Sequence, residues 1–158
     1  MTNKQPGTVL IVDDDDRNVR LLESLLQADG YTTLSARNGR EALDLAQERR
    51  PDLILLDVMM PVMDGFETAT QLKANRATQQ IPIIMVTSLD DRVSKLHALE
   101  AGAEEFLTKP IDRADLRVRV RNLLRLKEFS DFLADHNRIL ESQVAERTAQ
   151  LQNAYLDT

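Results

Sequence analysis

Four short, mostly apolar segments of this sequence each end in residues that can do chemistry. These terminal residues are Asp13 and Asp14, Asp57, Thr87 and Ser88, and Lys109. Neighbouring carboxylates repel one another unless a cation lies between them, and their hard oxygen atoms suit Mg²⁺ or Mn²⁺. An aspartate nucleophile beside a divalent cation, an ammonium group and a hydroxyl is typical of a phosphoryl-transfer site.

The segments before these residues read as strands of one buried sheet. Residues 9–12, 53–56 and 82–86 are wholly apolar, and residues 31–36 and 105–108 complete a set of five strands. Between these strands, apolar residues recur at the spacing of a helix. We expect helices between Asp16 and Gly30, over residues 40–50, ending near Ala74, and over residues 90–101. Strands alternating with helices indicate parallel pairing, and ligands of such α/β sheets bind beyond the carboxyl ends of the strands. We therefore expect the chemical residues on one rim.

Several polar residues and one glycine near this rim have simpler local explanations. Asp16 is a candidate N-cap of the first helix, and Asp15 adds negative charge at the same helix terminus. Gly65 is expected to permit a special backbone angle. His97 and His136 are isolated on helices, so we expect each to be solvated or partly packed rather than chemically active.

Four motifs, VLIVDDDDRNVRLL, LILLDVMMPVMDG, IIMVTS and FLTKP, resemble those of response-regulator receiver domains from two-component signalling. The resemblance covers roughly residues 8–127 in the same order and spacing. It implies a flavodoxin-like (βα)5 fold, with a doubly wound parallel sheet in the strand order 2-1-3-4-5. We accordingly predict a receiver domain over residues 1–127 and a coiled-coil signalling helix over residues 128–158.

The resemblance also assigns roles to individual residues. Asp57 would accept a phosphoryl group from a sensor histidine kinase or phosphotransfer protein. Asp13 and Asp14 would organise the metal, with Asp14, Asp57 and the backbone carbonyl of Met59 as its direct ligands. Thr87, Ser88 and Lys109 would bind the phosphoryl group, while Thr87 and Phe106 would form the conformational switch. Pro110 is a candidate cis proline.

Two apolar residues bear on how long such a phosphorylated state would last. Met59 and Leu89 lie two residues beyond the phosphoacceptor and the switch threonine. Members of the family often carry polar side chains there that orient the attacking water. The sequence therefore predicts slow autodephosphorylation.

The C-terminal part of the chain predicts one long helix. All 5 Gly and 5 Pro lie between Pro6 and Pro110, so residues 111–158 contain no helix breaker. A seven-residue apolar pattern continues through this region with seam residues Leu133, Asn137, Leu140, Val144 and Leu151. A lone polar helix of this length would not persist in water without a partner. The pattern predicts a parallel homodimeric coiled coil, and Asn137 in its seam would set register and strand number.

The end of this helix has a resemblance of its own. RILESQVAERTAQLQNAYLDT is similar to signalling helices that precede output domains, above all HD-GYP cyclic di-GMP phosphodiesterases. Similar helices precede diguanylate-cyclase and histidine-kinase modules. We therefore expect the chain to be part of a longer protein with such an output, or else a stand-alone adaptor.

The distribution of charged and apolar residues limits the kinds of partner that the chain could bind. The net charge is −6 and resides in the first 110 residues, which disfavours direct nucleic-acid binding. Arginines between 113 and 125 are instead expected to pair with Asp90, Asp91, Glu100 or Glu104 on a second homodimer surface, formed by the fourth helix, fifth strand and fifth helix. No apolar run could span a membrane, and MTNKQPGT is not a signal peptide, so we expect a cytoplasmic protein.

Two other functions are compatible with parts of the pattern. A free-standing Mg²⁺-dependent phosphohydrolase would need a second acid two residues after its nucleophile, where this chain has Met59. A purely structural dimerisation arm would not need the complete acidic set. The chemistry at Asp57 would act on the domain itself, so we do not expect this chain to be an enzyme with turnover.

Overall fold

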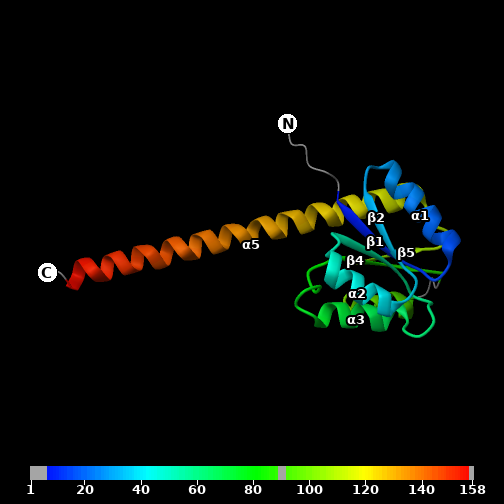
Figure 1. Ribbon diagram of the computed structural model, residues 1–158, viewed down its shortest axis with the longest axis horizontal. Coiled ribbons are helices and arrows are strands. Elements are labelled where there is room, and N and C mark those ends of the chain that lie inside the picture. The colour runs from blue at the N-terminus through cyan, green and yellow to red at the C-terminus, as the bar shows by residue number, and fades with distance from the viewer. Residues whose placement is uncertain (1–6, 89–91, 157–158) are drawn as a thin grey trace. The chain divides into compact units, whose positions relative to one another are not determined.

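The computed structural model describes residues 7–88 and 92–156 of the chain. Five parallel strands form one sheet in the order β2-β1-β3-β4-β5 (Figure 1). The strands are β1 (Thr8–Val12), β2 (Thr32–Ala36), β3 (Leu53–Asp57), β4 (Ile83–Thr87) and β5 (Glu105–Thr108). The helices are α1 (Asp16–Ala28), α2 (Gly39–Arg49), α3 (Gly65–Ala74), α4 (Arg92–Glu100) and α5 (Arg113–Leu156). The predicted α/β fold, strand order and long C-terminal helix are confirmed.

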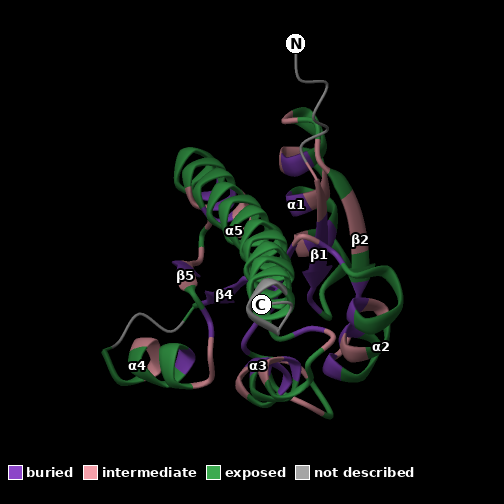
Figure 2. Ribbon diagram, turned by 90° about the vertical axis from the view of Figure 1, so that its left-hand side faces the viewer, coloured by how far each residue is buried: buried purple, intermediate pink, exposed green. Residues whose placement is uncertain are grey.

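Helices cover both faces of the sheet because its central strands are apolar over residues 9–12, 53–56 and 83–86 (Figures 1 and 2). Alternate residues of a strand point to opposite faces. One face packs on α2, α3 and α4 through Leu10, Leu56, Met85, Ala42, Leu72 and Ala98. The other face packs on α1 and the start of α5 through Ile11, Leu55, Val86, Leu22, Leu26, Leu116 and Val120. A sheet buried on both sides holds its strand ends in one rigid register.

The N-cap of α1 lies one residue earlier in the chain than predicted. Asp15, not Asp16, is the N-cap, and its side chain accepts a hydrogen bond from the Arg17 N–H at 2.9 Å. Asp16 is the first helical residue and pairs with Arg37 at 3.1 Å. Asp15 takes the cap because its backbone is extended, the geometry that lets a side chain turn back onto the first turn.

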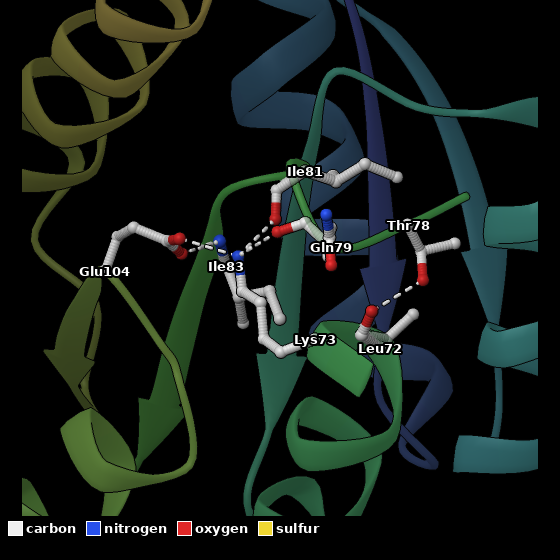
Figure 3. Close-up of polar contacts among 7 residues, drawn as sticks. All are labelled: Leu72, Lys73, Thr78, Gln79, Ile81, Ile83 and Glu104. Atoms are coloured by element: carbon white, nitrogen blue, oxygen red, sulfur yellow. Dashed lines mark hydrogen bonds and ion pairs between the residues drawn. The ribbon is translucent and has the colours of Figure 1, made fainter. Parts of the chain in front are cut away.

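A polar network joins α3 to the amino-terminal ends of β4 and β5, at the opposite edge of the sheet from the predicted rim (Figure 3). Lys73 Nζ donates to the carbonyls of Gln79 and Ile81 at 3.2 and 2.9 Å, and to Glu104 Oε1 at 2.6 Å. The other oxygen of Glu104 accepts from the Ile83 N–H at 2.6 Å. Within the chain, Glu104 therefore bonds to Lys73 and Ile83.

Two arginines of α5 form ion pairs within the chain. Arg119 pairs with Glu105 at 2.5 Å and with Asp115 at 2.8 Å. Arg117 pairs with Asp29 at 2.9 Å, beyond the end of α1. Glu105 lies on β5, Asp29 is the C-cap of α1, and Asp115 lies one turn earlier on α5 itself. Asp90 and Asp91 lie outside the described residues.

The chain divides into two compact units, Met1–Leu124 and Arg125–Thr158. The first contains the sheet and its covering helices, and the second is the remainder of α5. Between residues 128 and 153 every side chain is exposed. No helix within 7–88 or 92–156 is long and apolar enough to cross a membrane.

Candidate functional site

The carboxyl ends of four neighbouring strands place the predicted chemical residues on one rim. The Asp13 N–H donates to the Ala36 carbonyl at 3.1 Å, which places Asp13 directly beyond the end of β1. Asp57, the last residue of β3, is in register with Val86 of β4. The Lys109 N–H donates to the Thr87 carbonyl at 2.8 Å, so Lys109 follows β5 beside the end of β4. Parallel pairing alone brings these residues together from positions far apart in sequence.

Three carboxylates meet at the centre of this rim. Asp13, Asp14 and Asp57 each offer an oxygen within 4.8 Å of the others. Asp13 and Asp57 are buried, with 2% and 5% of their surface exposed, whereas Asp14 is exposed. One oxygen of Asp13 accepts from the Asp15 N–H at 2.9 Å, which orients the Asp13 carboxylate. Three oxygen donors around one point, two of them buried, fit a hard divalent cation such as Mg²⁺.

Lys109 is the cation that the chain itself supplies to this cluster. Its Nζ lies 3.3 Å from Asp57 Oδ1 and 3.8 Å from Asp13 Oδ2. Burial and the charges of Asp13 and Asp14 nevertheless raise the pKa of Asp57 to about 6, against the lowering effect of Lys109. One ammonium group thus offsets only part of the negative charge, and the site favours a further positive charge.

Gly65 supports the site by close approach and not by an unusual backbone angle, which corrects our expectation. A Cβ on Gly65 would lie 2.4 Å from the Asp57 carbonyl oxygen. The Gly65 N–H donates to the Val58 carbonyl at 2.9 Å, and Asp64 caps α3 by accepting from the Glu67 N–H at 2.8 Å. Only a residue without a side chain lets α3 begin directly against the end of β3.

The remaining predicted residues lie around the cluster. Thr87 is buried at the end of β4, and Ser88 after it is exposed. Met59 is 64% exposed in the loop after β3. The Lys109–Pro110 peptide bond is cis. Leu89 lies outside the described residues.

Phe106, the predicted switch aromatic, is half-buried on β5. It packs against the core on the side of α2, α3 and α4. Lys95 of α4 places its Nζ 5.0 Å from the centre of the Phe106 ring. The ring therefore lies between the core and α4, one residue from Leu107 in the sheet interior. His97, also on α4, stacks on Phe66 with ring centres 3.9 Å apart and so is partly packed, as expected.

Sequence reasoning missed a hollow beside the acidic cluster. A cavity of about 190 Å³ opens next to Asp13 and Lys109, with Asn18 and Leu21 of α1 on its wall. Leu21 is 52% exposed although it is a large apolar residue. The available signal was the i, i+3 spacing of Asn18 and Leu21, which puts both on the helix face next to the strand ends.

Comparisons with known proteins agree with this geometry. The family model of the response regulator receiver domain matches residues 9–121. Response regulator PleD of Caulobacter vibrioides is 49% identical over 125 residues, which are 79% of this chain and 28% of PleD. The polar-differentiation response regulator DivK of Brucella anthropi is 42% identical over 106 residues, which are 67% of this chain and 86% of DivK. The chain thus spans less than a third of PleD.

Solved structures show the same fold. A response regulator from Chloroflexus aurantiacus superposes with a TM-score of 0.74 at 38% identity, covering 76% of this chain and 98% of that one. The receiver domain of sensor histidine kinase PA1611 from Pseudomonas aeruginosa, solved with a magnesium ion in its active site cleft, has a TM-score of 0.70 at 29% identity. It covers 75% of this chain and 97% of that one. A family match over most of the sheet unit, with three carboxylates and a lysine on one rim, shows that the chain belongs to the response-regulator receiver domains of two-component signalling.

Proposed function

We propose that Asp57 is the phosphoacceptor of this receiver and takes a phosphoryl group from a histidine kinase or phosphotransfer protein. The observation that carries this proposal is the position of the Asp57 carboxylate, buried at the end of β3, 3.3 Å from Lys109 and within reach of Asp13 and Asp14. Receiver domains accept phosphoryl groups from histidine kinases, and Asp57 is the carboxylate at the centre of this cluster.

The chemistry asked of Asp57 is a single displacement at phosphorus. A carboxylate oxygen of Asp57 forms a bond to phosphorus as the bond from phosphorus to the donor's imidazole nitrogen breaks, and the electron pair stays on that nitrogen. Lys109 neutralises part of the charge on the phosphoryl oxygens, and the hydroxyl groups of Thr87 and Ser88 donate to them. The hollow beside Asp13, lined by Asn18 and Leu21, is the side from which the donor's imidazole approaches.

Asp14, Asp57 and the Met59 carbonyl would hold Mg²⁺, while Asp13 orients the set through its bond from the Asp15 N–H. The bound ion would neutralise negative charge at the phosphoryl group. The fit rests on the donor set, which is all oxygen and is short of positive charge. The magnesium ion in the PA1611 receiver supports the choice of metal.

Phosphorylation then acts on the face formed by α4, β5 and α5. Thr87 moves toward the phosphoryl oxygens, and Phe106 turns into the space that Thr87 leaves. Phe106 lies between the core and α4, so its movement changes that surface. Two copies of the chain associate as a homodimer through this surface and through the coiled-coil seam of Leu133, Asn137, Leu140, Val144 and Leu151. In each copy, residues 1–127 act as the receiver and residues 128–158 form one strand of a parallel coiled coil.

The coiled coil carries the change to an output domain, which we propose is a cyclic di-GMP phosphodiesterase of the HD-GYP class. The resemblance of residues 138–158 to helices that precede such domains supports this choice. The coding sequence downstream of Thr158 tests it directly. A diguanylate-cyclase or histidine-kinase motif there would replace the proposed output, and a stop codon would indicate a stand-alone adaptor.

Phosphorylation with acetyl phosphate tests the assignment of Asp57. With Mg²⁺, intact-mass spectrometry should show one added phosphoryl group on the wild-type chain and none on Asp57→Asn. An Asp44→Asn variant, changed on the exposed face of α2, should be phosphorylated like the wild type. Phosphorylation of Asp57→Asn at the wild-type rate would refute the assignment. Sustained turnover of a simple phosphate ester would instead favour a phosphohydrolase.

A further inference from the structure

A contact between α4 and β5 involves the aromatic ring that the proposed switch would move. Lys95 of α4 places its Nζ over the ring of Phe106, 5.0 Å from the ring centre. An ammonium group within about 6 Å of a ring centre is attracted to the face of the ring. Both residues are only partly exposed, so water screens this attraction less than it would on the open surface. The contact therefore contributes to where the Phe106 ring lies.

The packing of α4 places Lys95 on the side of the helix that faces the sheet. Ala98 is buried, with 2% of its surface exposed, in the core cluster against which Phe106 also packs. Residues three apart on a helix lie on the same face, so Lys95 shares the face of Ala98, and α4 lies beside β5 (Figure 2). Of the other basic residues of α4, Arg92 is exposed and His97 stacks on an aromatic ring of α3. Within the described residues of α4, Lys95 is therefore the cation that meets Phe106.

The space beside Thr87, into which the ring would turn, lies further along the same face of the sheet. Phe106 is in register with Met85 of β4, and Thr87 follows Met85 by two residues. Side chains two residues apart in a strand point to the same face and are about 6–7 Å apart. A ring that turns toward Thr87 therefore moves by a distance comparable to the range of its attraction to the ammonium group. Such a movement breaks the present contact unless the lysine side chain follows the ring.

We propose that Lys95 is a latch that holds Phe106 in its present position and so opposes phosphorylation of Asp57. The latch rests on the proposed function, because Phe106 must turn toward Thr87 when Asp57 is phosphorylated. A group that binds at Asp57 more tightly when the ring has turned must overcome the contact with Lys95. A larger share of chains in the latched state therefore lowers the apparent affinity of that group. Lys95 is thus a positioning residue, which acts on the site through Phe106.

The size and the sign of the effect separate the latch from simple electrostatics. A cation over an aromatic ring at a partly exposed site changes an equilibrium between two positions about two- to fivefold. A phosphoryl group or its mimic at Asp57 is an anion, so removal of a nearby positive charge by itself weakens its binding. Loss of the latch strengthens that binding instead. A gain in affinity on removal of the Lys95 charge would therefore identify the latch.

Titration of the full 158-residue chain with beryllofluoride, a mimic of the phosphoryl group, measures this affinity at saturating Mg²⁺. Lys95→Met should bind beryllofluoride about two- to fivefold more tightly than the wild type. Lys95→Arg keeps a cation at the ring and should bind like the wild type. Arg92→Met is the matched control, because it removes a charge from an exposed position of the same helix, and it should show no gain. In a Phe106→Leu background, Lys95→Met should also produce no gain, because leucine has no aromatic face.

The aromatic NMR signals of Phe106 in the free chain give a second readout. In Lys95→Met they should shift toward the values that the wild type shows with beryllofluoride, because more rings have turned before any ligand binds. Unchanged ring signals in this variant would show that the ammonium group does not hold the ring. Circular dichroism of each variant checks that its fold is retained.

The outcomes distinguish the latch from the proposed function on which it rests. A wild-type chain that binds no beryllofluoride with Mg²⁺ would overturn the proposed function, and the latch with it. Binding by the wild type with an equal or weaker affinity in Lys95→Met would overturn the latch and leave the proposed function standing. A gain of the same size in Arg92→Met, or in the Phe106→Leu background, would show that Lys95 does not act through the ring and would equally overturn the latch.

Discussion

Lys109 Nζ lies 3.3 Å from Oδ1 of Asp57, although the two residues are 52 positions apart in the chain. The contact exists because β5 and β3 both flank β4, so the residue after one strand and the last residue of the other meet at the same edge. Within residues 7–88 and 92–156, Lys109 is the positively charged residue in direct contact with the Asp57 carboxylate. Several measurable properties depend on it.

Replacing Lys109 with Met should raise the pKa of Asp57 further above the value of about 6 that it has beside the lysine. Burial, Asp13 and Asp14 all raise this pKa, and only Lys109 lowers it. A ¹³C NMR titration of the carboxyl group without metal measures the shift. Lys127→Met is the control, because Lys127 pairs with Asp131 in the second unit. An unchanged Asp57 titration in Lys109→Met would show that the ammonium group does not act on this carboxylate.

The raised pKa of Asp57 makes stability depend on pH in a defined window. Between about 3.8 and 6 the folded state holds a proton on Asp57 that the unfolded state has released, so stability falls as pH rises through this window. In metal-free buffer at neutral pH, Asp57→Asn should therefore be more stable than the wild type by about 2–3 kcal/mol. Urea unfolding at several pH values measures the difference, which should vanish in acid. Added Mg²⁺ should narrow it by stabilising the wild type.

Asp44→Asn is the matched control for the previous variant, since it also removes one carboxylate but from the exposed face of α2. It should show no comparable gain at neutral pH. Equal gains in both variants would indicate a general effect of net charge rather than relief of a buried carboxylate.

Replacing Gly65 with Ala should damage the acidic site without touching any charged group. The new Cβ would lie 2.4 Å from the Asp57 carbonyl oxygen, so α3 or the end of β3 must move. We expect a loss of about 1–3 kcal/mol in unfolding free energy and slower phosphorylation by acetyl phosphate. Gln71→Ala, on the exposed side of α3, should leave both properties unchanged. Wild-type phosphorylation in Gly65→Ala would mean that the close approach is dispensable.

The bond between Lys73 and Glu104 should contribute to stability more than an exposed pair does. Lys73 is 19% exposed and holds two backbone carbonyls as well as Glu104. A double-mutant cycle with Lys73→Met and Glu104→Gln should give a coupling of about 1–2 kcal/mol. The same cycle on Arg37 and Asp16, which are 68% and 51% exposed, should give about 0–0.5 kcal/mol. Equal coupling energies in the two cycles would show that partial burial does not strengthen the Lys73–Glu104 ion pair.

Loss of the phosphoryl group should be slow because Met59 is apolar and cannot orient a water molecule. Met59 is 64% exposed, so its side chain is free to be exchanged without disturbing the core. Met59→Asn combined with a polar residue at position 89 should accelerate dephosphorylation in a radiolabel chase. A wild-type phosphate half-life of seconds would refute the prediction of slow loss.

The strands of the sheet were predictable because each is indicated by its own short run of apolar residues. A run such as 53–56 is apolar throughout, which is typical of a strand buried on both faces, and its polar successor marks the rim. The strand order came from the family resemblance, since local pattern does not determine which strands are neighbours. The first residue of a helix could be predicted only to within one residue. Asp15 and Asp16 are adjacent and are the same residue type, so either could serve as the N-cap of α1 on sequence grounds.

The amino-acid sequence by itself determined which residue types stand at the strand ends, and it determined that no glycine or proline interrupts residues 111–158. Only the tertiary structure decided what those residues experience. Burial and two neighbouring carboxylates, not the residue type, raise the pKa of Asp57. The approach of α3 to β3, not a backbone angle, requires Gly65. Both effects arise from atoms far along the chain that the parallel sheet brings within a few ångströms, and no local pattern records such distances.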